Sequence, residues 1–252
     1  MKNFLLLFAL IPATIHAQST VENVPNWKAD LTISGFYQAG NVETKIFRAA
    51  SNISVKAYRN IFFETKNSYV FQEFGKTKAD EDILSLNFLN FNPDRKLYPL
   101  ALAFISTNFR REIDLRYIIG AGVSYRVLNE EDKSLQISVT TEFEHTEFGN
   151  ANYNRSQYDG DATLNTYRGT FWMNGKYELI ADKLILMHES FYQPSLQEAN
   201  NFRWRTNSGI ALPITEYLNI TLNYQHTYES IVIADEKKED RFVTLGFTLK
   251  SY

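Results

Sequence analysis

Apolar and polar residues alternate along most of the chain after Trp27. In residues 116–127, RYIIGAGVSYRV, every second position from Tyr117 to Val127 is apolar or aromatic, and the intervening positions hold mainly Arg, Gly and Ser. Successive side chains of a β-strand point to opposite faces, so this period of two predicts a strand with one apolar and one polar face. Whether the apolar face meets a protein core or lipid depends on the rest of the chain.

The same period recurs and predicts about twelve strands, with no convincing amphipathic helix between them. The predicted strands are 27–40, 44–58, 61–73, 82–92, 98–108, 116–127, 134–145, 164–179, 184–193, 203–214, 218–229 and 241–252. Those at 82–92, 98–108 and 184–193 alternate weakly, so ten or fourteen strands are alternatives. Twelve is an even number, as expected of a bacterial outer-membrane barrel.

The connections between these strands alternate in length. Connections after even-numbered strands are short, at 59–60, 92–96, 129–133, 180–183 and 214–217, and those after odd-numbered strands are longer and more polar, at 73–82, 147–163, 193–201 and 232–240. The first odd connection, 39–43, is the exception, and its Gly40-Asn41 pair suits a tight turn with positive φ. Short periplasmic turns and longer outer loops produce this pattern when both termini are periplasmic.

Strand length and aromatic content also favour contact of the apolar faces with lipid. Many predicted strands run about ten residues or more, the length needed to cross a bilayer at a tilt, whereas soluble strands usually end near five or six. The chain has 19 Phe and 15 Tyr against 3 Met, and aromatic residues gather near predicted strand ends, where membrane interfaces lie. The sequence therefore predicts an all-β fold: a closed antiparallel transmembrane β-barrel. A secreted soluble β-protein is the alternative.

The first residues resemble a secretory signal peptide. Lys2 precedes an apolar run from Phe4 to Ile11, and the small residue Ala17 suits a cleavage site. The predicted organisation is a signal peptide at 1–17 and one barrel domain at 18–252. The chain has no Cys, which excludes disulfides and cysteine-based metal sites, and its net charge of −3 does not favour a nucleic-acid partner.

Two segments resemble the salt-induced outer-membrane protein family, which was first defined as a domain of unknown function. ISGFYQAGNVET carries Gly35, Gly40, Asn41 and Thr44, and REIDLRYIIGAGVSYRV carries Asp114, Arg116, Gly120, Gly122 and Tyr125. The resemblance implies an outer-membrane β-barrel and offers no established activity, so it assigns no functional residues. The chain end departs from the usual pattern, because Tyr252 is out of phase with Phe247 and Leu249.

The polar face of the predicted strands carries many charges. The side chains expected to line the lumen are Arg48, Lys56, Lys66, Arg116, Arg126, Arg168, Lys176, Arg203 and Arg205, together with Glu64, Glu142, Glu144, Glu178 and Glu229. Charges inside a barrel must pair or stay hydrated. Two interpretations follow: a network of ion pairs that fills the lumen, or a narrow water-filled pore with a weak preference for anions.

Few residue patterns point to catalysis. The Gly-x-Gly-x-x-Tyr run at 120–125 lacks the following helix that a dinucleotide site needs, so its glycines are interpreted as lumen positions that relieve crowding. No histidine pair has metal-ligand spacing, and no cofactor is expected. His188 and Ser190 share one face of a strand, which is the arrangement of a base and nucleophile in a membrane lipid hydrolase, but a three-residue pattern often arises by chance.

We therefore expect a non-enzymatic integral barrel of the bacterial outer membrane, related to envelope or osmotic stress, that offers a narrow path for small solutes. The alternatives are a lipid hydrolase that uses His188 and Ser190, and a secreted soluble β-protein that binds a ligand. Outer-membrane lipid, the export and barrel-insertion machineries and small solutes are the expected partners.

Overall fold

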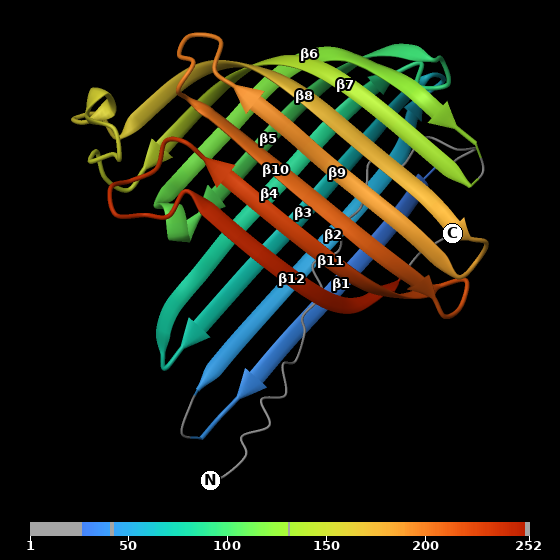
Figure 1. The fold of residues 1–252 in the computed structure, drawn as a ribbon, viewed down its shortest axis with the longest axis horizontal. Helices are drawn as coiled ribbons and strands as arrows, with labels where there is room; N and C mark the ends of the chain where they lie inside the picture. Colours follow the sequence, from blue (N-terminus) through green and yellow to red (C-terminus); the bar gives the residue numbers. More distant parts are fainter. Residues whose placement is uncertain (1–26, 41–42, 131, 250–252) are drawn as a thin grey trace.

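The computed structural model describes residues 27–40, 43–130 and 132–249 and contains one sheet of twelve antiparallel strands (Figure 1). The strands are β1 Trp27–Gln38, β2 Thr44–Tyr58, β3 Ile61–Phe74, β4 Thr77–Phe91, β5 Leu97–Asn108, β6 Ile113–Asn129, β7 Lys133–Phe148, β8 Thr163–Ile180, β9 Leu184–Pro194, β10 Phe202–Pro213, β11 Leu218–Glu229 and β12 Glu239–Leu249. Two short 3₁₀ helices, η1 Phe109–Arg111 and η2 Ser156–Tyr158, lie in the connections. The predicted signal peptide at 1–17, Asn41 of the first turn and Tyr252 lie outside the described residues.

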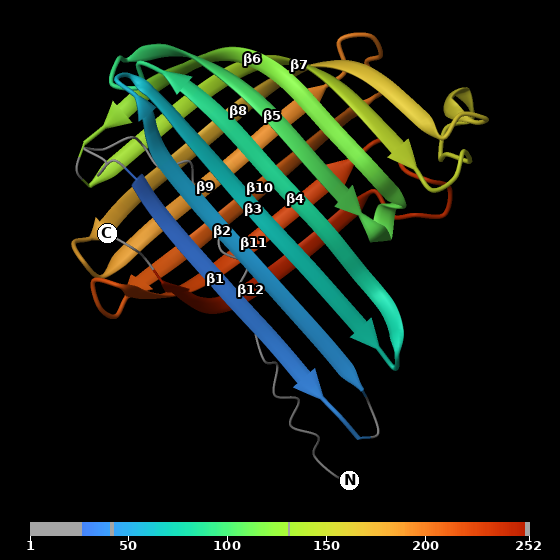
Figure 2. The same cartoon turned by 180° about the vertical axis from the view of Figure 1, so that it is seen from behind.

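Each strand pairs with its neighbours in chain order, and the sheet curls around a central space that we call the lumen. Seen from behind in Figure 2, β1 and β12 cross each other and are in contact. Among the described residues they share no hydrogen-bonded ladder, so β1 and β12 form the two edges of the sheet. No helix in the described ranges is long and apolar enough to cross a membrane.

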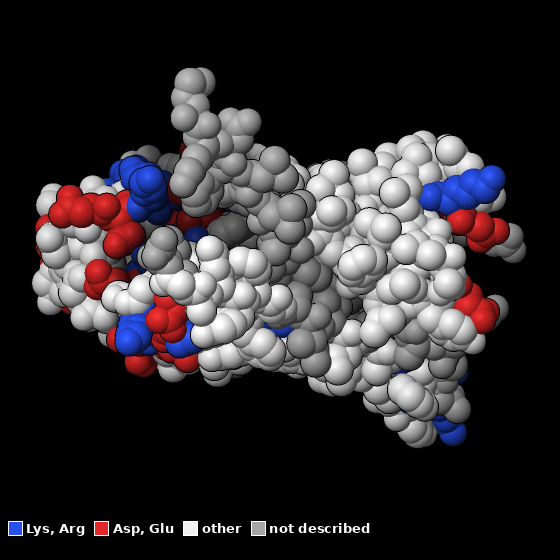
Figure 3. Space-filling view, turned by 90° about the horizontal axis from the view of Figure 1, so that it is seen from below, with Lys and Arg blue, Asp and Glu red and all other residues white. Residues whose placement is uncertain are grey.

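The sheet carries its apolar residues on the outside. Ile119 and Val139 are 60% and 54% exposed, whereas Arg116 and Ser124, on the opposite face, are buried. In Figure 3 most charged side chains gather at the two ends of the molecule, and the described surface between them is almost free of charge. This distribution is the reverse of a soluble protein's and matches a wall that meets lipid.

Connections after odd-numbered strands lie at one end of the sheet, the loop end, and those after even-numbered strands at the other, the turn end. The predicted long connections at 147–163, 193–201 and 232–240 are confirmed as loops. The one predicted at 73–82 is wrong: β3 and β4 meet in a two-residue turn at Gly75 and Lys76. Both residues have positive φ, 56° and 69°, which matches the twist of a hairpin and lets the strands continue to the turn.

An apolar cluster lies inside the curl, on the walls formed by β4, β5, β6 and β8. It contains Leu86, Phe88, Leu100, Leu102, Phe104, Ile118 and Trp172, with Leu84 and Phe191 packed against it. The indole Nε1 of Trp172 donates to the hydroxyl of Thr140 at 3.1 Å, so the one polar atom of that side chain is satisfied. Because β4 and β5 carry apolar residues on both faces, their alternation in the sequence is weak.

Gly120 and Gly122 allow β6 and β7 to approach at a place where a side chain would not fit. A Cβ on Gly122 would lie 2.0 Å from the carbonyl oxygen of Val139 and 2.6 Å from the Cα of Thr140. A Cβ on Gly120 would lie 2.6 Å from the carbonyl oxygen of Thr141. The interpretation of these glycines as positions that relieve crowding agrees with this geometry.

Candidate functional site

The loop-end half of the lumen contains a cavity of about 360 Å³. Its lining comes from β2 to β6 on one side and from β8 to β12 on the other. Leu86, Phe104, Ile118 and Trp172 belong both to this lining and to the apolar cluster, so the cluster forms part of the cavity floor. The remaining lining is mostly polar and charged, and three groups of ion pairs in and around it join the strands.

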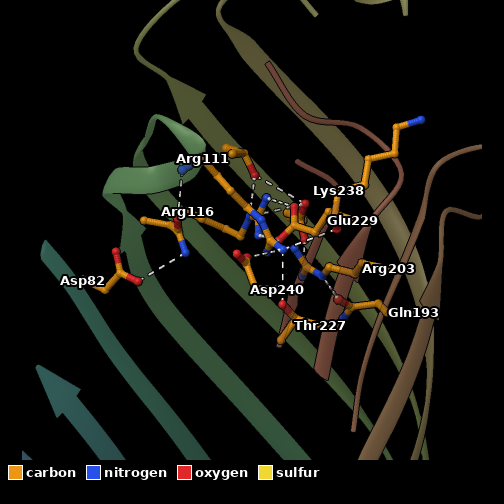
Figure 4. A network of polar contacts seen from close by, with 12 residues as sticks. Asp82, Arg111, Arg116, Gln193, Arg203, Thr227, Glu229, Lys238 and Asp240 are labelled. Carbon is orange, nitrogen blue, oxygen red and sulfur yellow. Dashed lines mark hydrogen bonds and ion pairs between the residues drawn. The ribbon is translucent and has the colours of Figure 1, made fainter. Parts of the chain in front are cut away.

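The first group is centred on Glu229 of β11 (Figure 4). Arg116 donates to both carboxylate oxygens of Glu229, each at 2.9 Å, and Arg111 Nη1 donates at 3.1 Å. Arg111 also pairs with Asp240 Oδ2 at 2.8 Å. A bidentate arginine–carboxylate pair fixes both partners, so this group ties β6, η1, β11 and β12 together inside the lumen.

The second group is centred on Glu144 of β7. Arg168 donates to its two oxygens, each at 3.0 Å, and Arg203 Nη2 pairs with Oε2 at 2.5 Å. Arg203 also donates through Nε to Gln193, whose amide donates to Glu142 at 2.6 Å. Glu142 is 1% exposed and accepts from neutral donors, and no described cation pairs with it. The second group therefore joins β7, β8, β9 and β10.

The third group crosses the lumen. Lys66 on β3 pairs with Glu189 Oε2 on β9 at 3.2 Å, and Arg205 on β10 pairs with Glu189 Oε1 at 2.7 Å. Lys66 stands opposite Leu86 in the β3–β4 register, so this ion pair lies level with the apolar cluster. We call these three residues the strut, since they connect opposite walls where the cavity ends.

The structure places the predicted lumen residues in three zones. Arg48, Lys66, Arg116, Arg203, Arg205 and Glu229 line the cavity, Glu64, Arg126, Glu142, Glu144 and Arg168 are buried in the wall around or below it, and Lys56, Lys176 and Glu178 lie toward the turn end with more exposure. The sequence analysis missed six charged residues of the cavity: Asp80, Asp82, Arg110, Arg111, Glu189 and Asp240.

The loops after β7 and β11 pair with each other at the loop end. Tyr153 and Ile233 form an antiparallel bridge and pack with Phe148 in a second apolar cluster. Burial raises the pKa of Tyr153 to about 12. Phe148 lines the same small pocket as Arg116 and Glu229, so the paired loops cover that side of the ion-pair network.

Residues 19–250 match the family described as a protein of unknown function, DUF481. The chain belongs to the DUF481 family. No curated protein matches the chain. The description of the family confirms an uncharacterised family and leaves the salt-induced outer-membrane name a prediction.

Solved structures that are similar to this DUF481 protein are membrane barrels. A NanC porin structure matches with a TM-score of 0.53 at 9% identity and covers 89% of this chain and 99% of that chain. The translocator domain of the autotransporter NalP from Neisseria meningitidis matches with a TM-score of 0.47 at 11% identity, covering 92% of this chain and 91% of that chain. At these identities the likeness to the porin shows the fold alone.

His188 and Ser190 of the DUF481 chain are brought together on the outer face of β9. Glu189 between them points into the lumen, so the two flanking side chains point away from it. Nε2 of His188 lies 3.2 Å from the hydroxyl of Ser190, and Nδ1 lies 2.8 Å from the hydroxyl of Ser208. In the described part of the chain no carboxylate contacts this imidazole, so the group that would orient a catalytic base is replaced by a serine.

Among the residues that the structure describes, no three or more His, Asp or Glu side chains are grouped so that they could hold a metal ion. The carboxylates of the lumen are instead engaged by arginine and lysine or by neutral donors, as described for Glu229, Glu144 and Glu142. The chemistry that this arrangement offers is the recognition of charged and polar groups.

Proposed function

We propose that this DUF481 protein is a non-enzymatic integral barrel of the bacterial outer membrane that passes small solutes through a narrow, charge-lined lumen. The observation that carries the proposal is the reversed distribution of side chains, with an apolar surface almost free of charge between two charged ends and most of the buried charged groups inside. Such a wall is stable where hydrocarbon surrounds it and is unfavourable in water.

Closure of the sheet into a complete barrel is part of this proposal. An even number of strands with up-and-down connections makes β1 and β12 antiparallel, and the two strands already touch. Unpaired backbone groups are costly in a bilayer, which favours a ladder between these edges. In the proposed orientation both termini are periplasmic, and a cleaved signal peptide and the barrel-insertion machinery bring the chain to the membrane.

The strut and the apolar cluster make the path narrow. Both lie at the end of the cavity nearest the middle of the strands, where Lys66 and Glu189 contact each other across the lumen. A solute must pass between the ion pair and the apolar wall, so the proposed conductance is small. The role in envelope or osmotic stress rests on the family resemblance in the sequence, and slower growth of a deletion strain at high salt would support it.

Glu189→Gln tests the path directly. The substitution removes the carboxylate shared by Lys66 and Arg205, so that Lys66 keeps its pair with Glu64, at 3.7 Å, and Arg205 has no ion-pair partner among the described residues. We expect the variant to conduct more than the wild type in planar bilayers and to prefer anions more strongly. Glu178→Gln, toward the turn end, is the matched control and should leave conductance unchanged. If the folded wild type and the folded Glu189→Gln variant both show no conductance, the result would contradict a solute path.

A lipid hydrolase is the second candidate, favoured by the 3.2 Å contact between His188 and Ser190 on the outer face. Without a carboxylate beside His188 we expect no hydrolysis of phospholipid vesicles above background, and the same result for Ser190→Ala. Phospholipid hydrolysis by the wild type that disappears in Ser190→Ala would establish the enzyme and refute the non-enzymatic assignment.

A further inference from the structure

The cavity offers hydrogen-bond donors that the protein itself does not use. Nη1 of Arg203 and Nε of Arg205 and Arg48 are buried and have no hydrogen-bond partner among the described residues. All three side chains line the cavity. A buried donor without an acceptor is unfavourable, and more so when it belongs to a charged group.

Each carboxylate of the cavity has a partner, although Oδ1 of Asp80 is buried with no hydrogen-bond partner among the described residues. Glu229 is held by two arginines, Glu189 by Lys66 and Arg205, and Asp240 by Arg110 and Arg111. In the cavity lining, seven Arg and Lys side chains face five Asp and Glu side chains. The hydrogen-bonding atoms of the lining that have no partner therefore belong mainly to guanidinium groups, which bind anionic oxygen atoms well.

One wall of the same cavity is apolar and aromatic. Phe191 joins it to the cationic wall: its ring centroid lies 4.9 Å from that of Trp172, and the guanidinium of Arg205 stands 5.3 Å above it. Arg203 and Arg205 are two positions apart on β10 and therefore project from the same face of the strand. A ligand in contact with both arginines would thus reach the aromatic wall as well.

We propose that the cavity binds a small organic acid, with its acid group on Arg205 and Arg203 and its apolar body against Phe191 and Trp172. The volume of about 360 Å³ is within the range of pockets that hold small molecules. Fully hydrated inorganic anions gain nothing from the aromatic wall, and neutral aromatic molecules leave the guanidinium donors unpaired. The inference deepens the proposed function, on which it rests, by naming the class of solute.

Calorimetric titration of the folded, detergent-solubilised protein tests the inference with phenylacetate as the probe. Phenylacetamide has the same ring without the charge, acetate has the charge without the ring, and phenethylammonium reverses the charge. We expect phenylacetate to bind and each of the other three to bind at least about tenfold more weakly, because each lacks one of the two contacts. Equal binding of phenylacetamide or of acetate would overturn the proposal.

Two variants place the ligand in this cavity. Arg205→Gln should weaken phenylacetate binding about tenfold, whereas the matched control Arg241→Gln, at a side chain that is 63% exposed, should not change it. Should Arg205→Gln fail to fold, Phe191→Leu removes the ring against which the apolar body is proposed to pack, and it should weaken phenylacetate binding by a similar factor. Unchanged binding in the folded variants would refute the site.

The two proposals fail in different ways. Protein that conducts in bilayers but does not bind phenylacetate refutes the organic-acid site and leaves the barrel function intact. Protein that binds phenylacetate in detergent but is silent in bilayers refutes the solute path and leaves the site.

Discussion

Replacing Glu229 by Ala should lower the free energy of unfolding by about 3–5 kcal/mol, because it leaves the buried guanidinium of Arg116 without its bidentate partner and leaves Arg111 with Asp240 alone. Arg116 donates two hydrogen bonds of 2.9 Å to Glu229, and its side chain is 10% exposed. A buried ion pair adds little net stability compared with an apolar pair. Removing one partner, however, leaves the other charge buried and unpaired, which is strongly destabilising. The measurement is urea unfolding in detergent micelles, followed by tryptophan fluorescence.

Glu130→Ala is the matched control for this prediction. Glu130 also pairs with a cation, Lys133 at 2.8 Å, but its side chain is 55% exposed. Exposed ion pairs contribute at most about 1 kcal/mol, so this variant should unfold close to the wild type. A loss of less than about 1 kcal/mol in Glu229→Ala would mean that the lumen is hydrated enough to solvate both arginines, and would refute the description of the network as buried.

Gly122→Ala should cost about 3 kcal/mol or more, at the upper end of the effects of overpacking. The new Cβ would lie 2.0 Å from the carbonyl oxygen of Val139 and 2.6 Å from the Cα of Thr140, and both are backbone atoms that only a movement of β7 can displace. The expected result is a much smaller yield of the fast-migrating folded band on unboiled SDS gels, together with a lower urea midpoint.

Gly175→Ala on β8 provides the comparison. Its added Cβ would meet Leu135 Cδ1 and the carbonyl oxygen of Ser134 at 3.5 Å, which is ordinary contact. Gly175 has negative or extended φ like its neighbours in the strand, so the substitution introduces no backbone strain and should leave folding near that of the wild type. Equal effects of the two substitutions would show that the close approach of β6 and β7 is not present in the folded protein.

The alternation of side chains made much of the fold predictable. A period of two is a local property, so strands such as β6 and β7 could be found without knowing their partners. The outward orientation of the apolar faces was predictable as well, since the lengths of the strands and of the connections between them can be estimated from the sequence. The twelve strands and three of the long loops agree with these predictions.

The turn between β3 and β4 was missed because of one residue. Lys76 adopts φ of 69°, a conformation that is uncommon for residues other than glycine, and the polar stretch around it is typical of a loop. Treating 73–82 as a loop also removed Asp80 and Asp82 from the list of lumen residues. Asp80 is 2% exposed and pairs with Arg110 at 3.1 Å, so the error extended from the fold to the candidate site.

The ion pairs themselves could not be predicted. Lys66 and Glu189 are 123 positions apart, and their contact depends on how far the sheet curls rather than on any local pattern. The weak alternation of the ninth strand also hid Glu189. The apolar cluster had a similar effect: inward-facing residues such as Phe88 and Phe104 obscure the polar face by which a lumen is recognised.

The central claim is that the apolar outer face contacts hydrocarbon. Nitroxide spin labels at Ile119 and Val123, which are 60% and 46% exposed, report on that face, and a label at Asn207, in the cavity lining, reports on the lumen. In protein reconstituted in vesicles, we expect oxygen dissolved in the acyl chains to relax the two outer labels strongly, while an aqueous nickel chelate leaves them unaffected. We expect oxygen to relax the label at Asn207 less than it relaxes the two outer labels. Outer labels that respond to the nickel chelate and not to oxygen would contradict the account.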